Sequence, residues 1–215
     1  MKSFLYPIFY QPLFNLLALL SLFFSSNLGL AIFVLAIGIR ILMWPWYGKI
    51  TISQKKLTRI QPQIQEIQKK YKADPRQANQ LVFQLFKDEK VNPLATFGFV
   101  ILQFFLFIGI WVLLTELIKN GWSSHLYHFL PQVPLNFMFL SFDLAKPNLF
   151  LTIIYVVLGF ISGLLQKETS QNKMLLFFPF IFLLIYKSFP SALMVFWIGL
   201  SLVDLIQRFQ LRNIS

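Results

Sequence analysis

The chain has 215 residues, of which 57% are hydrophobic, 13% are charged and 26 are Phe. Soluble domains are roughly 45–50% apolar and about 25% charged, so a soluble globule is excluded, and the high hydrophobicity excludes a disordered chain. The absence of Cys excludes a disulfide scaffold. The composition therefore predicts an integral membrane protein. The net charge of +11 then raises the question of where the positive residues lie relative to the spans.

Residues 1–27 contain a short apolar stretch, residues 13–24, which follows Pro7 and Pro12. As a helix this stretch rises only about 18 Å, which is less than the roughly 30 Å of a bilayer core. We therefore predict an N-terminal interfacial amphipathic helix that lies along the membrane. A sixth span at this position is the alternative.

Five further apolar segments predict five transmembrane helices in an all-α protein. They cover residues 28–48, 97–118, 148–166, 173–187 and 191–208, with an outer loop over residues 119–147. The first three have the length that a span of about 20 residues needs, with roughly 17 at the low end. The last two are shorter and are separated by a turn around Pro190, which predicts a helical pair that ends at the interface or thins the bilayer locally.

Residues 49–96 predict a basic cytoplasmic helical hairpin. Apolar residues repeat at spacings of three and four on either side of the pair Asp74-Pro75, which is typical of a helix N-cap and first turn. We predict that Pro62 begins a new helix or kinks the first one. A solvated linker with incidental periodicity is the alternative. The two apolar sets are Leu57, Ile60, Ile64, Ile67 and Tyr71, then Ala78, Leu81, Val82, Leu85 and Phe86.

The positive charges are distributed unevenly between the two sides that five spans define. Residues 49–96 hold ten Lys and Arg against four Asp and Glu. The turn over residues 167–173 and the C-terminal segment, on the same side, bring the total there to fourteen, against four on the other side. By the positive-inside rule this predicts the N-terminus outside and the C-terminus in the cytoplasm. The basic excess also suits contact with anionic lipid or ribosomal RNA, without specificity for a nucleic acid sequence.

Arg40 is the charged residue that topology does not explain. It lies about 18 Å along the first predicted span, where a charge costs at least about 2.5–3.5 kcal/mol, and such residues face a partner or a wet cavity. No acidic residue is expected at the same depth. A salt bridge with Asp204, near the end of the last span, is one interpretation. We favour the other, in which Arg40 faces a water-filled groove open to the cytoplasm and attracts anionic groups of a substrate.

Two other residues inside the predicted spans bear on a groove. Gln103 lines the same cavity or bonds to a neighbouring helix, and the sequence leaves both open. Trp197 lies in mid-span, which favours core packing. The sequence has no nucleophile elbow, metal-protease motif or phosphate-binding loop, so we expect no enzyme activity, no metal and no cofactor.

The order of these parts resembles the YidC family of membrane protein insertases, in a short form without a large outer domain. The resemblance covers about residues 12–210. The residues that carry it are Ile39-Arg40, Trp44-Pro45, Ile60-Gln61-Pro62, Lys69-Lys70-Tyr71-Lys72, Asp74-Pro75, Val91-Asn92-Pro93-Leu94-Ala95, Gln103, Asp143-Leu144-Ala145-Lys146-Pro147, Phe189-Pro190-Ser191 and Phe196-Trp197.

The resemblance implies a five-helix core with a hydrophilic groove, lined by Arg40, Gln103, Gln166 and Trp197. It implies insertase and chaperone activity in the bacterial inner membrane: hydrophilic tails of nascent membrane proteins cross through the groove, and spans leave laterally into lipid. Nascent membrane proteins are the implied substrates, with the ribosome and the Sec translocon as partners. The alternative function is a small anion transporter or channel that uses Arg40 as its site.

Overall fold

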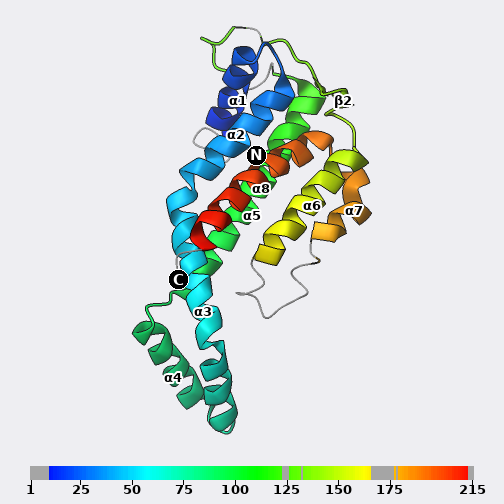
Figure 1. Cartoon of the computed structure of the whole chain (residues 1–215). Coiled ribbons are helices and arrows are strands. Elements are labelled where there is room, and N and C mark those ends of the chain that lie inside the picture. Colours follow the sequence, from blue (N-terminus) through cyan, green and yellow to red (C-terminus); the bar gives the residue numbers. More distant parts are fainter. Residues whose placement is uncertain (1–9, 123–125, 132, 166–176, 178, 213–215) are drawn as a thin grey trace.

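Figure 1 shows the computed structural model of the chain, which is built almost entirely of helices. The structure describes residues 10–122, 126–131, 133–165, 177 and 179–212. The elements in these ranges are α1 (Gln11–Phe23), α2 (Leu28–Leu42), α3 (Trp44–Lys70), α4 (Pro75–Asp88), α5 (Pro93–Asn120), β1 (Met138–Phe139), β2 (Phe142–Asp143), α6 (Leu149–Leu165), α7 (Ile181–Ile185), the 3-10 turn η3 (Tyr186–Ser188) and α8 (Ser191–Arg212). The prediction of an all-α protein is confirmed.

The helix α8 lies at the centre of the bundle and packs most extensively against α2 and α6 (Figure 1). Residues 191–197 of α8 are all buried, so the helix is enclosed on every side at this end. The close approach of α2 and α8 depends on Gly199, because a Cβ at that position would lie 2.9 Å from the Cβ of Ala36. Small residues at such crossings let two backbones approach, and van der Waals packing then drives the association of helices in a membrane.

The helix α1 packs against α2 and buries one face there. Phe14, Leu17 and Ala18 on this face are fully buried. Asn15 joins them and accepts a hydrogen bond on its side-chain oxygen from the backbone N–H of Tyr127, at 2.7 Å. The helix α1 therefore holds the loop after α5 as well as α2. The prediction that it lies along the membrane surface stays a prediction.

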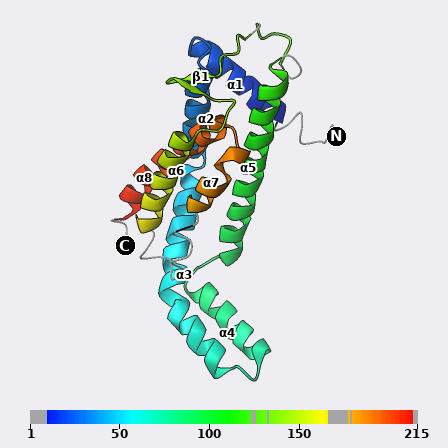
Figure 2. The ribbon, with the colours of Figure 1, turned by 90° about the vertical axis from the view of Figure 1, so that its right-hand side faces the viewer.

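A bend of 60° separates α2 from α3. Pro45 lies in the first turn of α3, where a missing N–H is tolerated. In an uninterrupted helix its ring would clash with the carbonyl of Ile41. The predicted single helix over residues 28–48 is therefore corrected: α2 ends at Leu42, and α3 leaves in a new direction (Figure 2).

Two helices of the described part, α5 over Ile101–Asn120 and α8 over Ser191–Gln210, are long and apolar enough to cross a bilayer. The bent pair of α2 and α3 makes a third if it forms one span, whereas α1 and α6 are apolar but shorter. The predicted span over residues 173–187 lies partly outside the described residues. Its described part forms α7, which rises only about 8 Å, and η3. The count of five spans stays a prediction.

The helix α4 packs back along the second half of α3 and forms with it the α3–α4 arm, residues 49–91, which projects from the bundle (Figures 1 and 2). As predicted, Asp74 caps α4: its Oδ1 accepts hydrogen bonds from the backbone N–H groups of Arg76 and Gln77, both at 3.1 Å. The arm has a small core of its own, which consists of Ile60, Ile64 and Val91, with Leu57, Val82, Leu85 and Phe86 packed against them.

The prediction that Pro62 begins a new helix is wrong, because α3 continues through Pro62 to Lys70. The prediction of a kink at Pro62 stays a prediction. A proline inside a helix costs roughly 3 kcal/mol through a lost hydrogen bond and a steric clash. Ile60 and Ile64, on either side of it, are both buried against α4 and the following segment. Burial of two such side chains contributes about 1.5–3 kcal/mol each, which is enough to hold the helix together.

At the end of the molecule opposite the α3–α4 arm, β1 and β2 form a hairpin that was not predicted from the sequence. Its two turn residues, Leu140 and Ser141, have φ values of 45° and 73°. A two-residue hairpin turn of this kind favours Asn and Gly, so the sequence carries no signal for it. Phe139 of β1 lies directly over Gly29 of α2, where a Cβ would come within 2.2 Å of its ring.

The segment after this hairpin closes the N-terminal end of α8. The backbone N–H groups of Ser191 and Ala192 donate to the carbonyls of Lys146 and Leu144, at 2.9 and 3.0 Å. These groups are the orphan donors of a helix start, so the segment acts as the cap of α8. Lys146 Nζ lies 3.0 Å from Asp143 Oδ2 and, by this hydrogen bond, holds the pKa of that carboxyl below its ordinary value.

Candidate functional site

Arg40 lies in the last turn of α2, just before the bend, and its side chain is only 6% exposed. Its Nη2 donates to Asp204 Oδ1 of α8 and forms a salt bridge there. Its guanidinium also lies over the ring of Tyr47, with 3.5 Å between Cζ and the ring centroid. A cation at this position is stabilised by both the carboxylate and the negative face of the aromatic ring.

The carboxylate of Asp204 joins three helices. Its Oδ2 accepts hydrogen bonds from Arg208 Nε at 2.6 Å and from Ser162 Oγ of α6 at 2.5 Å. Arg208 Nη2 also donates to the hydroxyl of Tyr47. We call these five residues, Arg40, Tyr47, Ser162, Asp204 and Arg208, the arginine cluster.

The expectation that no acidic residue lies at the depth of Arg40 is therefore wrong. That expectation assumed a straight helix from residue 28 to residue 48, which places Arg40 near mid-membrane. The bend after Leu42 instead puts Arg40 at the end of α2 and beside the C-terminal half of α8. The salt bridge with Asp204, which was the less favoured interpretation of the sequence, is the contact that the structure has.

The arginine cluster carries unbalanced charge. Two guanidinium groups share one carboxylate, and an Arg side chain keeps its proton, so the cluster has a net charge of one positive unit. All three ionised side chains are at most 13% exposed. Charges act on one another more strongly there than in water, because the surroundings screen them less. Such a cluster attracts an anion to this side of the bundle.

The local sequence explains why these groups meet. Asp204 and Arg208 lie four residues apart, so they share one face of α8. Gln207, on the same stretch, is buried, and its Nε2 donates to the backbone carbonyl of Trp44 at 2.9 Å. That bond ties α8 to the first turn of α3, next to the bend. The bend in turn places Tyr47 beneath Arg40.

Gln103, one of the predicted groove residues, lies on α5 and is not a member of the arginine cluster. Residues 101–105 are all exposed, and five consecutive residues of a helix cover every face of it. This turn of α5 is therefore largely left uncovered by the described elements. The opposite end of the helix is held in the core by Ile110, Leu113 and Leu117. The helix α5 is thus buried in the core at one end and exposed around Gln103, and it also contacts α3 (Figure 2).

Trp197, another predicted groove residue, lies in an aromatic cluster rather than in an open space. It is 8% exposed. Its ring stacks on Phe107 of α5 with 5.1 Å between centroids and contacts Tyr155 of α6 at 5.0 Å and Phe182 of α7 at 4.7 Å. The interpretation of Trp197 as a packing residue thus matches its surroundings. The fourth predicted groove residue, Gln166, lies outside the described residues.

Three members of the arginine cluster were not predicted from the sequence: Tyr47, Ser162 and Arg208. Asp204 was considered as a partner of Arg40 but not as the centre of a network. A usable signal was present, because an Asp and an Arg at positions i and i+4 within an apolar span form a charged pair that needs further partners.

Comparison with known proteins gives the family. A family model described as "60Kd inner membrane protein" matches residues 19–215. The chain is 30% identical to "Membrane protein insertase YidC" of Maridesulfovibrio salexigens over 199 residues, which is 89% of this chain and 36% of that protein. It is 29% identical to the protein of the same name from Lawsonia intracellularis over 191 residues, 86% of this chain and 35% of that protein. The chain thus spans about a third of the length of these relatives.

A solved structure shares the fold. A structure described as "Active YidC insertase crystal structure with the first transmembrane domain resolved" matches with a TM-score of 0.63 and 22% sequence identity, over 95% of this chain and 46% of that chain. The resemblance inferred from the order of motifs is thereby confirmed. The family match over most of its length shows that this chain belongs to the 60Kd inner membrane protein family, whose matched relatives are named YidC insertases.

Proposed function

We propose that the chain is a membrane protein insertase and chaperone, which moves hydrophilic tails of nascent membrane proteins across the bilayer. The relatives named as insertases support this proposal. The observation that carries it within this chain is the arginine cluster, a buried set of side chains with net positive charge between α2, α3, α6 and α8. A buried charge in a membrane bundle is typical of a substrate pathway.

The proposed mechanism uses the positive cluster and the exposed turn of α5 together. An acidic tail enters from the side of the α3–α4 arm, where Arg40 attracts it and Gln103 offers a hydrogen-bonding side chain. Polar surroundings at this depth shorten the distance that the tail travels without water, and each unsatisfied polar group in hydrocarbon costs several kcal/mol. Apolar spans leave along the exposed side of α5 into lipid. Trp197 supports this site by packing, and Gln166 stays a proposed lining residue.

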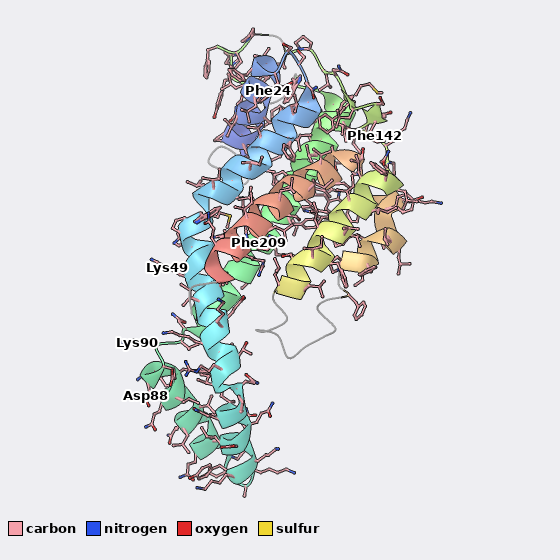
Figure 3. The ribbon with its side chains drawn as sticks, in the orientation of Figure 1. Phe24, Lys49, Asp88, Lys90, Phe142 and Phe209 are labelled. Carbon is pink, nitrogen blue, oxygen red and sulfur yellow. The ribbon has the colours of Figure 1, made fainter. Side chains whose placement is uncertain are left out.

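We infer the orientation from the two ends of the molecule. Figure 3 places Phe24 and Phe142 at one end, and Asp88 and Lys90 on the arm at the other. The arm holds all ten Lys and Arg of residues 49–96, which favours its placement in the cytoplasm of a bacterium. The proposed topology has five spans, with the N-terminus outside the cell and the C-terminus in the cytoplasm. The α3–α4 arm is the cytoplasmic helical hairpin. The positive charge of the arm also favours anionic lipid and the ribosome as partners. The Sec translocon is a further proposed partner.

Replacement of Arg40 tests the proposed function. Arg40→Ala should weaken or abolish growth of an insertase-depleted cell and insertion of a reporter with an acidic translocated tail, whereas Arg40→Lys should retain much of both. Arg59→Ala is the matched control, because Arg59 is an exposed arginine of α3. Full complementation by Arg40→Ala, with normal insertion of the acidic reporter, would refute the mechanism.

The alternative of an anion transporter makes a different prediction. Labelling of a single Cys in place of Arg40 is straightforward, because the chain has none. The insertase predicts access for a water-soluble reagent from the arm side only. Access from both sides, together with anion flux in proteoliposomes, would favour the transporter.

A further inference from the structure

The contact between Asp204 and Arg40 uses only one oxygen of the carboxylate and one nitrogen of the guanidinium. On the carboxylate, Oδ1 contacts Arg40, while Oδ2 contacts Arg208 and Ser162. On the guanidinium, Nη2 makes the contact, and Nε is buried with no hydrogen-bond partner among the described residues. Arginine binds carboxylates best as a fork, with two parallel hydrogen bonds, and Asp204 does not provide this to Arg40.

From this asymmetry we propose that Asp204 is an internal competitor for Arg40 and sets how acidic a tail must be before it is inserted. The inference rests on the proposed function, since it assigns the carboxylate of the tail as the group that displaces Asp204. A carboxylate from Asp or Glu that approaches Arg40 can take Nε and Nη2 together. Asp204 therefore acts as a specificity-determining residue that touches the binding group and not the substrate.

The exchange is feasible because Asp204 does not become a lone buried charge when Arg40 leaves it. Arg208 and Ser162 keep its Oδ2, at 2.6 and 2.5 Å. Removal of one partner from a buried pair is costly only where the other charge is left uncompensated. The net positive charge of the arginine cluster means that one tail carboxylate would bring it to neutrality.

The competition predicts opposite effects for two variants of neighbouring residues. In Asp204→Asn the internal anion is lost, so Arg40 is free for weakly acidic tails. In Arg208→Gln the carboxylate keeps its hydrogen bond from Ser162 and loses one of its two charged partners, so Arg40 is held more tightly and a tail needs more acidic residues. A purely structural role for the cluster predicts that both variants lower insertion together.

The experiment uses the full chain in proteoliposomes and a series of reporters whose tail carries an increasing number of Glu residues in place of Gln. Protection of the tail from added protease measures insertion. Asp204→Asn should raise insertion of the least acidic Glu tail about tenfold, the effect of roughly one charge-assisted hydrogen bond. In Arg208→Gln, the curve of insertion against the number of Glu residues should shift, so that more Glu residues are needed for the same insertion. Parallel losses in both variants, or unchanged curves, would overturn the inference.

Two further variants keep the result interpretable. If Asp204→Asn does not accumulate, Ser162→Ala removes one donor from Oδ2 and should shift the curve in the direction of Arg208→Gln; no shift would again overturn the inference. Arg40→Ala separates the two proposals. If it leaves the dependence on Glu intact, the charge mechanism of the proposed function fails; if it abolishes the dependence while Asp204→Asn changes nothing, only the competition by Asp204 fails.

Discussion

The contact between α2 and α8 gives a prediction for Gly199. A Cβ at this position would lie 2.9 Å from the Cβ of Ala36 and 3.1 Å from the carbonyl oxygen of Phe33. Carbon atoms prefer separations of about 3.5–4.0 Å, so Gly199→Ala must push the two helices apart by a large part of an ångström. Overpacking of this kind costs about 1–3 kcal/mol. The displacement would also act on the arginine cluster, since Asp204 lies just over one turn further along α8.

The assay for this prediction is the unfolding temperature of the purified chain in detergent, together with a double-mutant cycle. Gly199→Ala should lower that temperature, and Ala36→Gly should cost less in the Gly199→Ala background than in the wild type, because it removes the Cβ that causes the clash. The rescue should be partial, since the contact with Phe33 remains. Unchanged stability of Gly199→Ala, or strictly additive effects of the two substitutions, would refute the close-packing argument.

Two further predictions concern groups outside the bundle core. Asp74→Ala removes the cap of α4 and should destabilise the α3–α4 arm by about 1 kcal/mol, seen as faster amide hydrogen exchange in residues 75–79 but not in α8; equal exchange in both would contradict it. Since the pKa of Asp143 is lowered in the folded protein, its contact with Lys146 stabilises the fold above about pH 4 and is lost as the pH falls through the folded value. Asp143→Asn should remove this part of the acid dependence of the unfolding temperature, and an unchanged pH profile would show that the contact contributes nothing.

Local signals in the sequence predicted much of the helical framework. Apolar runs placed α5, α6 and α8 to within a few residues, and the pair Asp74-Pro75 placed the start of α4. These features depend on residues that are close in sequence. The bend before α3 also has a local signal, Pro45, whose ring disfavours a continuous helix.

The arginine cluster could not be predicted in the same way. Its central salt bridge joins residues 40 and 204, and whether they meet depends on the bend after Leu42 and on the close approach of α2 to α8 at Gly199. The continuity of α3 through Pro62 likewise depends on packing against α4, which overrides the local preference of proline. Tertiary contacts therefore decide the features that matter most for the site.

Cross-linking between a tail and Gln103 tests the central claim, that the arginine cluster draws an acidic tail into this side of the bundle. Gln103→Cys supplies the only thiol of the chain, at a described and exposed position. A reporter with one Cys beside its Glu residues should form a disulfide with it, and Arg40→Ala should strongly reduce the yield, whereas Arg59→Ala should not. An equal yield with Arg40→Ala, or with a tail in which Gln replaces Glu, would contradict the claim.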